Sequence, residues 1–157
     1  MVAEPANVRI VRAGHEDLDD LVPLFDGYRQ FYGQRSDFDG ARAFLGERLR
    51  RSESVIYVAR SDPDAPVGFT QLYPSFSSVS MKAIWILNDL FVRHDLRRSG
   101  VARRLLERAA QHAIETGARG LWLATGVANV AAQRLYESSG WRRDSEFQHY
   151  YLLTEPP

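Results

Sequence analysis

The sequence predicts an α/β fold, more closely an α+β fold, in a single domain of residues 1–157. Short β-branched and apolar runs occur among longer segments whose apolar residues recur at spacings of three and four, so both strands and helices are expected. The length of 157 residues fits one domain, and 45% apolar with 25% charged residues is ordinary for a globular protein.

The N-terminal half is expected to contain a strand, two helices and a hairpin. Residues 8–12 form the first strand, and a helix opens at His15. Residues 38–51 form a second helix. Strands at 55–59 and 67–73 flank a turn rich in Asp and Pro, and residues 74–80 form a serine-rich connection. One apolar face of the first helix is made by Leu18, Leu21, Val22, Phe25, Tyr28 and Tyr32.

The C-terminal half is expected to begin with a strand at residues 83–92. A helix follows Gly100 and ends near Gly117, and residues 120–124 form a short buried strand. The last helix covers residues 129–139 and is closed by Gly140 as its left-handed residue. Trp141 and residues 147–153 supply one or two closing strands.

The turn between the strand and the helix of residues 86–106 has the features of an anion site. Gly100 lies among arginines where the first N–H groups of the helix lack partners and the helix dipole is positive. The spacing matches neither G-x-x-x-x-G-K-S/T nor G-x-G-x-x-G, which excludes a P-loop and a dinucleotide fingerprint. An ordinary turn with a solvated basic edge is the other interpretation.

Composition excludes several kinds of chemistry. Without cysteine there is no disulfide, thiolate metal site or cysteine nucleophile, and the four histidines lack metal-binding spacings. Twenty basic and 20 acidic residues balance, which gives no support for a nucleic-acid or membrane partner. No apolar stretch approaches the roughly 20 residues of a membrane span. Residues 1–13 lack the apolar segment of a signal peptide, so a cytoplasmic location is expected.

Charge is distributed unevenly along the chain. Residues 15–39 are mainly acidic, whereas residues 93–108 are mainly basic. A basic patch at a helix N-terminus suits a phosphorylated ligand, and an acidic surface suits a cationic ligand. Two solvated faces are the other interpretation of the same residues.

Three motifs in order resemble the GNAT superfamily of acetyl-CoA-dependent N-acetyltransferases. They are a strand running into R-x-x-G-x-A at residues 97–102, a strand ending in Ala124-Thr125, and N-x-x-A-x-x-x-Y-x-x-x-G-W at residues 129–141. The resemblance covers about residues 84–153, and within the superfamily the chain is somewhat similar to the polyamine and diamine acetyltransferases. It implies a mixed, mostly antiparallel sheet of six to seven strands with helices on both faces.

The resemblance implies a site for acetyl-CoA as co-substrate and no metal. The pyrophosphate would lie on the backbone N–H groups and arginines of the turn. The pantetheine arm would lie like an added strand against the preceding strand, and Asn129 matches a cofactor-contacting amide. The expected cofactor-binding residues are Leu90, Phe91, Val92, Arg97, Arg98, Ser99, Gly100, Val101, Ala102, Arg103, Asn129 and Tyr136.

The implied reaction is attack of an unprotonated amine on the thioester carbonyl. Tyr136 matches the tyrosine that many family members place near the sulfur, so it is expected as general acid; a core tyrosine is the other interpretation. Polyamine enzymes carry Glu-Asp where this chain has Asn88-Asp89, which leaves Asp89 as the base, acting through water, or as a structural acid. Strand alternation would separate these two side chains unless a bulge intervenes. A backbone N–H near Leu90 would meet the oxyanion.

The expected substrate is the primary amine of a small cationic molecule such as a polyamine, a diamine or a basic amino acid. Its expected contacts are Tyr28, Tyr32, Asn88 and Asp89. A protein N-terminus or lysine side chain is the second candidate, and a CoA-binding module without turnover is the third. Because family members are often homodimers, a homodimer is expected.

Overall fold

The computed structural model describes residues 7–155, which form two compact units that divide after Ala124. The first unit contains the sheet, and the second contains the last helix. Each unit is described by itself. Residues 1–6 and 156–157 lie outside the described residues. They are the two ends of the expected single domain, and residues 1–6 also belong to the N-terminal segment considered for a signal peptide.

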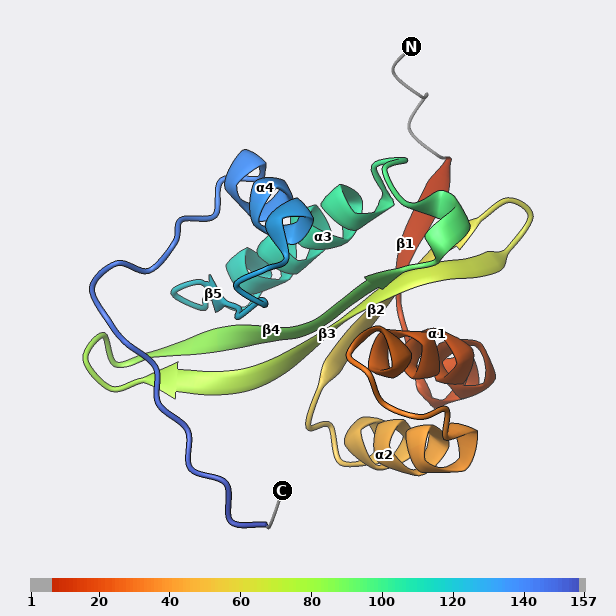
Figure 1. The fold of residues 1–157 in the computed structure, drawn as a ribbon, viewed down its shortest axis with the longest axis horizontal. Helices are drawn as coiled ribbons and strands as arrows, with labels where there is room; N and C mark the ends of the chain where they lie inside the picture. The colour runs from red at the N-terminus through yellow and green to blue at the C-terminus, as the bar shows by residue number, and fades with distance from the viewer. Residues whose placement is uncertain (1–6, 156–157) are drawn as a thin grey trace. The chain divides into compact units, whose positions relative to one another are not determined.

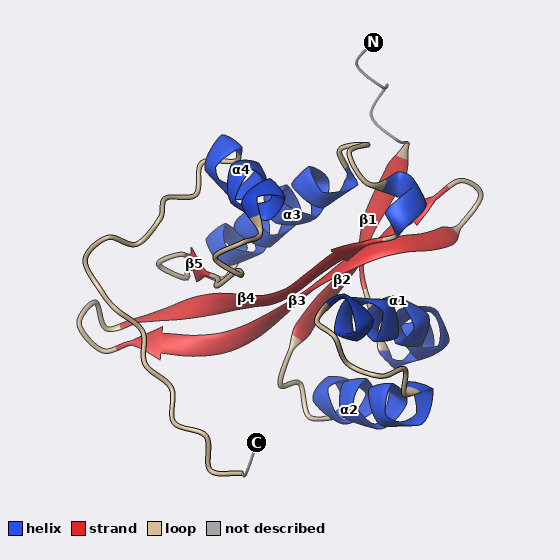
Figure 2. Ribbon diagram, in the orientation of Figure 1, coloured by secondary structure: helices blue, strands red, loops and turns tan. Residues whose placement is uncertain are grey.

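The first unit is built on a sheet of five strands in the order β1-β2-β3-β4-β5 (Figures 1 and 2). The strands are β1 (Val8–Arg12), β2 (Val55–Ser61), β3 (Ala65–Ser77), β4 (Lys82–Val92) and β5 (Leu121–Trp122). The first four pair antiparallel, and β5 pairs parallel to β4. The mixed, mostly antiparallel sheet is confirmed, but the prediction of six to seven strands was wrong.

Helices cover both faces of this sheet (Figure 1). Ile56 and Val58 of β2 lie in the core formed with α1 and α2. Tyr57 between them points to the other face, where its hydroxyl is 3.0 Å from Nδ1 of the α3 residue His112. The helices of this unit are α1 (Leu18–Phe31), α2 (Phe38–Arg50) and α3 (Val101–Glu115), with short 3-10 helices η1 (His15–Asp17) and η2 (His94–Leu96).

β3 extends further than the sequence indicated. Residues 74–77, expected in a loop, continue the strand and pair with β4 as far as Ser77 opposite Lys82. Pro74 is tolerated because β2 pairs with β3 only as far as Leu72, so the missing N–H of Pro74 lies on an unpaired edge. The paired end of the hairpin carries the exposed side chain of Phe76.

The strands expected at Trp141 and at residues 147–153 do not form. Helix α4 (Val130–Ser138) ends in a Schellman motif, in which Trp141 N–H donates to Tyr136 O (3.0 Å) and Gly140 N–H donates to Glu137 O (3.2 Å). Gly140 has φ 87°, as predicted. Residues 142–155 have no ladder partner among the described residues and are exposed. Their apolar side chains favour a strand, but a strand also needs a paired neighbour.

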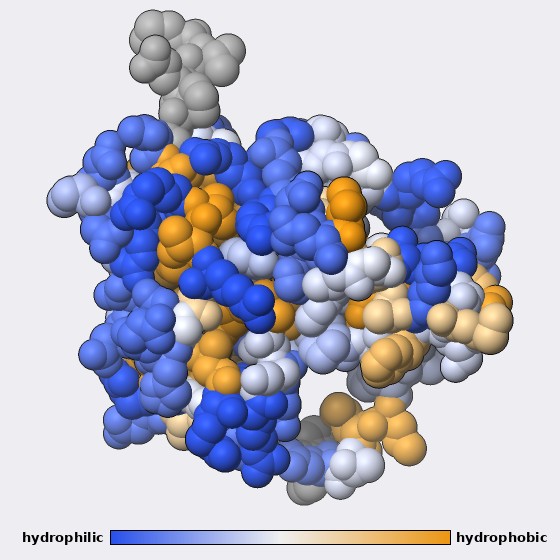
Figure 3. All heavy atoms as spheres, turned by 180° about the vertical axis from the view of Figure 1, so that it is seen from behind, coloured by the Kyte–Doolittle hydropathy of each residue, from blue (hydrophilic) through white to orange (hydrophobic). Residues whose placement is uncertain are grey.

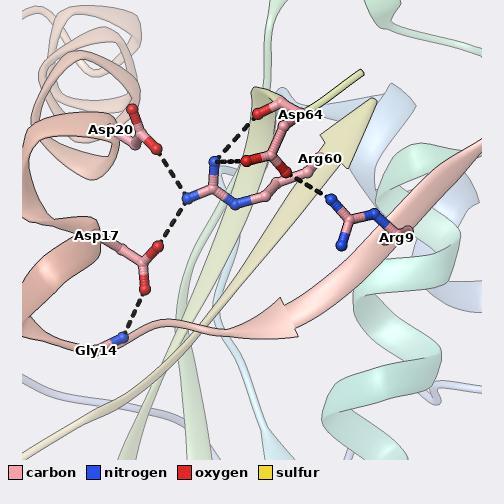
Figure 4. Close-up of polar contacts among 6 residues, drawn as sticks. All are labelled: Arg9, Gly14, Asp17, Asp20, Arg60 and Asp64. Carbon is pink, nitrogen blue, oxygen red and sulfur yellow. Dashed lines mark hydrogen bonds and ion pairs between the residues drawn. The ribbon is translucent and has the colours of Figure 1, made fainter. Parts of the chain in front are cut away.

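Arg60 of β2 ties the start of α1 to the sheet (Figure 4). Its buried guanidinium pairs with Asp17 (2.7 Å) and Asp20 (2.8 Å), and more weakly with Asp64 of the β2–β3 turn (3.6 Å). Asp17 also accepts a hydrogen bond from Gly14 N–H (2.8 Å). These acids compensate a charge that would be costly to bury alone.

The face of the molecule drawn in Figure 3 is mostly hydrophilic, with apolar residues in separate patches. Within the described residues, no helix combines the length and apolar character needed to cross a membrane.

Candidate active site

The strand β4 changes register at Asn88. Gln71 of β3 lies opposite Asp89, but the next β3 residue, Leu72, lies opposite Leu87, so Asn88 is the extra residue of a β-bulge. At the bulge the two adjacent side chains are in contact, and Asn88 Nδ2 donates to Asp89 Oδ1 at 2.8 Å. The alternation that would have separated Asn88 from Asp89 is interrupted at this point.

Asp89 is a buried carboxyl with amide donors on both oxygens. Its exposed fraction is 2%, and Gln71 Nε2 donates to Oδ2 while Asn88 serves Oδ1. Burial raises the pKa of Asp89 above its ordinary value, and the hydrogen bonds from Gln71 and Asn88 act in the opposite direction. Asn88 itself is exposed, so the pair joins a buried acid to the surface.

Tyrosines surround this acid on the side of α1. The hydroxyl of Tyr28 donates to the backbone oxygen of Asn88 (3.1 Å), and Tyr32 packs edge-on against Tyr28 with ring centroids 5.0 Å apart. Burial and the charge of Asp89 raise the pKa of Tyr28, and they raise the pKa of Tyr73 to about 12. Both hydroxyls therefore stay protonated at neutral pH. The four residues expected to meet the substrate lie around one point of β4.

The turn between β4 and α3 has left-handed backbone at Arg98 (φ 60°) and Gly100 (φ 86°). Gly100 is the N-cap of α3, and glycine adopts this conformation without the steric cost of a side chain. The first N–H groups of an α-helix, here those of Val101 and Ala102, have no preceding turn of the helix to accept their hydrogen bonds. The turn therefore has the backbone geometry of an anion site.

Several side chains of the expected cofactor site are engaged within the protein. Arg97 Nε donates to Val92 O (3.3 Å), and its guanidinium lies 5.5 Å from the ring centre of Phe31 and 5.9 Å from that of Phe91. Val92 and Val101 are buried in the core. A cofactor contact at these two valines would have to use their backbone.

The outer edge of β4 is paired only near its start. β5 pairs with Trp85 and Ile86, and in the described part of the first unit no strand pairs with this edge at residues 87–92. Arg93 N–H bonds to Val67 O of β3 (2.9 Å). Because hydrogen bonding alternates along a strand, the N–H of Leu90 points away from β3, to the open edge.

Asn129 and Tyr136 belong to the second unit. Asn129 caps α4, since its side chain accepts a hydrogen bond from Ala132 N–H (3.2 Å). Tyr136 is half-buried, and its ring packs against Trp141 with centroids 6.1 Å apart. Within this unit, both residues therefore have structural roles at the two ends of one helix.

The acidic stretch of residues 15–39 serves the fold to a large extent. Asp17 and Asp20 pair with Arg60, and Asp19 pairs with Arg42 (2.6 Å). The buried Asp26 accepts hydrogen bonds from Gln30, Ser36 and the N–H of Asp37, which lower its pKa against the effect of burial. The negative charges of these four acids are therefore compensated within the fold.

Sequence reasoning missed Gln71 and Tyr73. The available signal was a glutamine within the apolar strand at residues 67–73, on the same face as Phe69 and Tyr73. The 18-residue separation between Gln71 and Asp89 hides their contact from local patterns. Among the described residues, no group of three or more His, Asp or Glu side chains is arranged to hold a metal ion.

Comparison with known proteins decides the family. The sequence matches the acetyltransferase (GNAT) family over residues 18–141. The chain belongs to the GNAT family. The uncharacterized N-acetyltransferase YhfO of Bacillus subtilis is 48% identical over 145 residues, covering 92% of this chain and 97% of that protein. The crystal structure of a probable acetyltransferase is 51% identical, with a TM-score of 0.90 and coverage of 95% of this chain and 99% of that one.

A more distant structure shares the fold. The aminoglycoside N-acetyltransferase AAC(6')-Iy, solved in complex with CoA, has a TM-score of 0.78 at 18% identity and covers 97% of this chain and 99% of its own. GNAT enzymes use acetyl-CoA to acetylate amines of small molecules or proteins, and this chain is an N-acetyltransferase of that family. The comparisons do not show the expected particular likeness to polyamine acetyltransferases.

Proposed function

We propose that this GNAT enzyme transfers acetyl from acetyl-CoA to the primary amine of a small cationic substrate, by direct attack in a ternary complex. The observation that carries the proposal is the buried carboxyl of Asp89 at the β4 bulge, beside an open strand edge. A buried acid at a strand irregularity, with its pKa raised above its ordinary value by burial, is typical of a group that exchanges protons.

The cofactor site is proposed at the turn and the open edge. The N–H groups from Arg98 to Ala102 receive the pyrophosphate, and the arginines of the turn add positive charge. The pantetheine arm lies along the outer edge of β4 at Leu90 and Val92, where backbone groups are available for strand-like pairing. The N–H of Leu90 then meets the oxygen of the thioester carbonyl as it gains negative charge.

Asp89 is the proposed base. An alkyl ammonium has a pKa near 10 and must lose a proton before its nitrogen can attack. Asp89 takes this proton through water, while Asn88 cannot take a proton and instead orients the carboxyl by its hydrogen bond. A solely structural role for Asp89 is the alternative, and its two amide partners are compatible with it.

Tyr136 is the proposed general acid, which gives its hydroxyl proton to the CoA thiolate as the carbon–sulfur bond breaks. Asn129 is proposed to contact the cofactor with its amide. Both roles are carried over from the N-x-x-A-x-x-x-Y motif of the family, to which this chain belongs. A homodimer in the cytoplasm is still a prediction.

The preference for a cationic amine rests on Asp89 together with the aromatic wall. Tyr28 is half-buried and Tyr32 is 52% exposed, so the wall has a surface on which an alkyl chain can lie next to the acid. Aromatic faces also attract ammonium groups. A protein N-terminus or a lysine side chain remains the second candidate for the same site.

The substrate class can be tested with purified protein, acetyl-CoA and an amine panel. The panel contains polyamines, diamines, basic amino acids, uncharged primary amines and short peptides with free N-termini, and the release of free thiol is followed. We expect turnover first with small cationic amines and little with uncharged ones. Turnover confined to peptides would replace the proposed substrate class, and no turnover despite acetyl-CoA binding would overturn the proposal.

A further inference from the structure

Gln71 is a polar side chain in an apolar environment. It is fully buried in the middle of β3, on the face that packs against α1 and α2. Ile56 lies opposite it on β2, and Phe69 precedes it on the same face. An apolar side chain would pack here without the cost of burying an amide, so the glutamine needs a specific explanation.

A hydrogen bond to Asp89 explains why a glutamine occupies position 71. Gln71 lies directly across the ladder from Asp89, and its Nε2 donates to Asp89 Oδ2. Its other polar atom, Oε1, is buried and has no hydrogen-bond partner among the described residues. The amide nitrogen of Gln71 therefore donates to the carboxyl of Asp89, whereas the amide oxygen accepts no hydrogen bond among the described residues.

An amide is suited to a neighbour that changes its protonation state. Its NH₂ group can donate to an ionised carboxylate, and after rotation by half a turn its oxygen can accept from a protonated carboxyl. The unpartnered Oε1 of Gln71 makes this rotation possible without breaking another hydrogen bond. Leucine could serve neither state, and lysine or arginine would serve only the ionised one.

The other polar groups near Asp89 do not duplicate this role. Tyr28 of α1 and Tyr73 of β3 lie near enough to Asp89 for its charge to raise their pKa values, and Tyr32 packs against Tyr28. Arg48 of α2 is near enough for its charge to act on Tyr73. Burial and the charge of Asp89 raise the pKa values of Tyr28 and Tyr73, so these two hydroxyls stay protonated across the neutral range and do not compete with Asp89 for the proton.

We propose that Gln71 is a positioning residue for acetyl transfer, which holds the Asp89 carboxyl in place at the bulge in both of its protonation states. The proposal rests on the proposed role of Asp89 as base. During the reaction, Asp89 takes one proton of the substrate ammonium through water, the amine nitrogen attacks the thioester carbon, and the carbon–sulfur bond breaks. The CoA thiolate takes the hydroxyl proton of the proposed acid Tyr136, and the attacking nitrogen gives up its second proton, which restores the Tyr136 hydroxyl through water. Gln71 then presents Oε1 to the new O–H of Asp89.

The test compares Gln71→Leu and Gln71→Met with wild type by two readouts. The first is kcat/KM against pH with the best amine of the panel. The second is the infrared carbonyl band of the protonated Asp89 carboxyl as a function of pH, with Asp89→Asn as the blank. Two Gln71 variants are used so that a folding defect in one does not decide the result.

Loss of Gln71 removes a hydrogen bond from Asp89 in both protonation states, but the bond to the ionised carboxylate is charge-assisted and is the stronger of the two, so the ionised state is destabilised more. We expect the acidic limb of kcat/KM and the infrared midpoint of both variants to move to higher pH by about one to two units. Thr70→Val is the matched control, because the buried Thr70 hydroxyl donates only to the backbone oxygen of Asp89 (2.8 Å). It should change neither midpoint.

The two readouts separate the two claims. An unchanged infrared midpoint in the folded Gln71 variants would overturn the positioning role and leave Asp89 as a candidate base. A shifted infrared midpoint with an unshifted kcat/KM limb would overturn the base role of Asp89, and the proposal with it. Equal shifts in Thr70→Val would attribute the effect to the strand rather than to Gln71.

Discussion

Replacement of Gly100 by alanine should weaken acetyl-CoA binding much more than it destabilises the fold. Gly100 has φ 86° at the start of α3. An L-residue in this conformation costs about 1–2 kcal/mol, offset by about 0.4–1 kcal/mol from the reduced entropy of the unfolded chain. A net loss of roughly 1 kcal/mol lowers Tm by about 2–4 °C for a chain of this size.

Binding is the more sensitive measurement. If the turn relaxes away from the left-handed conformation, the neighbouring N–H groups rotate away from the pyrophosphate. A hydrogen bond to a charged group contributes about 1.5–3 kcal/mol, so the loss of one such bond raises Kd by about tenfold to a hundredfold. Isothermal titration with acetyl-CoA measures this change, and thermal unfolding measures the loss of stability.

Gly117→Ala provides a matched control at the opposite end of α3. Gly117 has φ 66°, and an added Cβ would have no heavy atom within 4 Å, so the substitution introduces backbone strain without a clash. It should lower Tm by a similar amount and leave acetyl-CoA affinity unchanged. An unaltered affinity in Gly100→Ala, or an equal loss in Gly117→Ala, would refute the placement of the pyrophosphate at the turn.

Four further predictions concern the Asp89 carboxyl, the Tyr136 hydroxyl and the ion pairs of Arg60. Asp89→Asn should lower kcat/KM by about 10²–10⁴-fold if Asp89 is the base, and near-normal turnover would exclude that role. Because burial raises the pKa of Asp89, ionisation of this carboxyl destabilises the native state as the pH rises through that pKa. Melting curves from about pH 4 to about pH 8 should therefore show Asp89→Asn gaining stability relative to wild type. A stability difference that stays constant with pH would contradict this. Tyr136→Phe should lower kcat and leave the Kd for acetyl-CoA nearly unchanged, and an unaltered rate would remove Tyr136 as the acid. Arg60→Leu should lower the free energy of unfolding, measured in urea, by about 1–3 kcal/mol, a loss limited by the partial exposure of its acidic partners. Arg9→Leu removes an exposed ion pair and should cost under about 1 kcal/mol. Equal losses in the two variants would contradict the special role of the buried arginine.

Local patterns predicted the elements that local interactions specify. The first strand was placed at residues 8–12 and the second helix at residues 38–51, and the structure has β1 at Val8–Arg12 and α2 at Phe38–Arg50. The start of α3 after Gly100 was also predicted correctly, because its glycine and its apolar spacing lie within a few residues of each other. None of these three predictions required knowledge of a distant partner.

The wrong predictions depend on pairing between distant segments. Pro74 indicated a loop, but it lies on a strand edge that β2 does not reach. Residues 147–153 have the composition of a strand, yet among the described residues they have no paired neighbour. In both places the sequence shows the preference of the segment, and the ladder decides whether a strand forms.

The candidate site shows the same division. The turn at Gly100 was visible as a motif, whereas the bulge at Asn88 follows from a change of register between β3 and β4. The partnership of Gln71 with Asp89 follows from that register as well. Similarly, the pairing of Asp17 with Arg60, 43 residues away, could not be inferred from the acidic composition of the first helix.

A crystal structure of the protein with acetyl-CoA tests the central claim most directly, because it places the reacting carbonyl. We expect the thioester oxygen within hydrogen-bond distance of Leu90 N–H, next to the bulge that carries Asp89. We also expect the pyrophosphate on the N–H groups between Arg98 and Ala102. A thioester bound away from the β4 bulge, or a pyrophosphate bound away from this turn, would contradict the account.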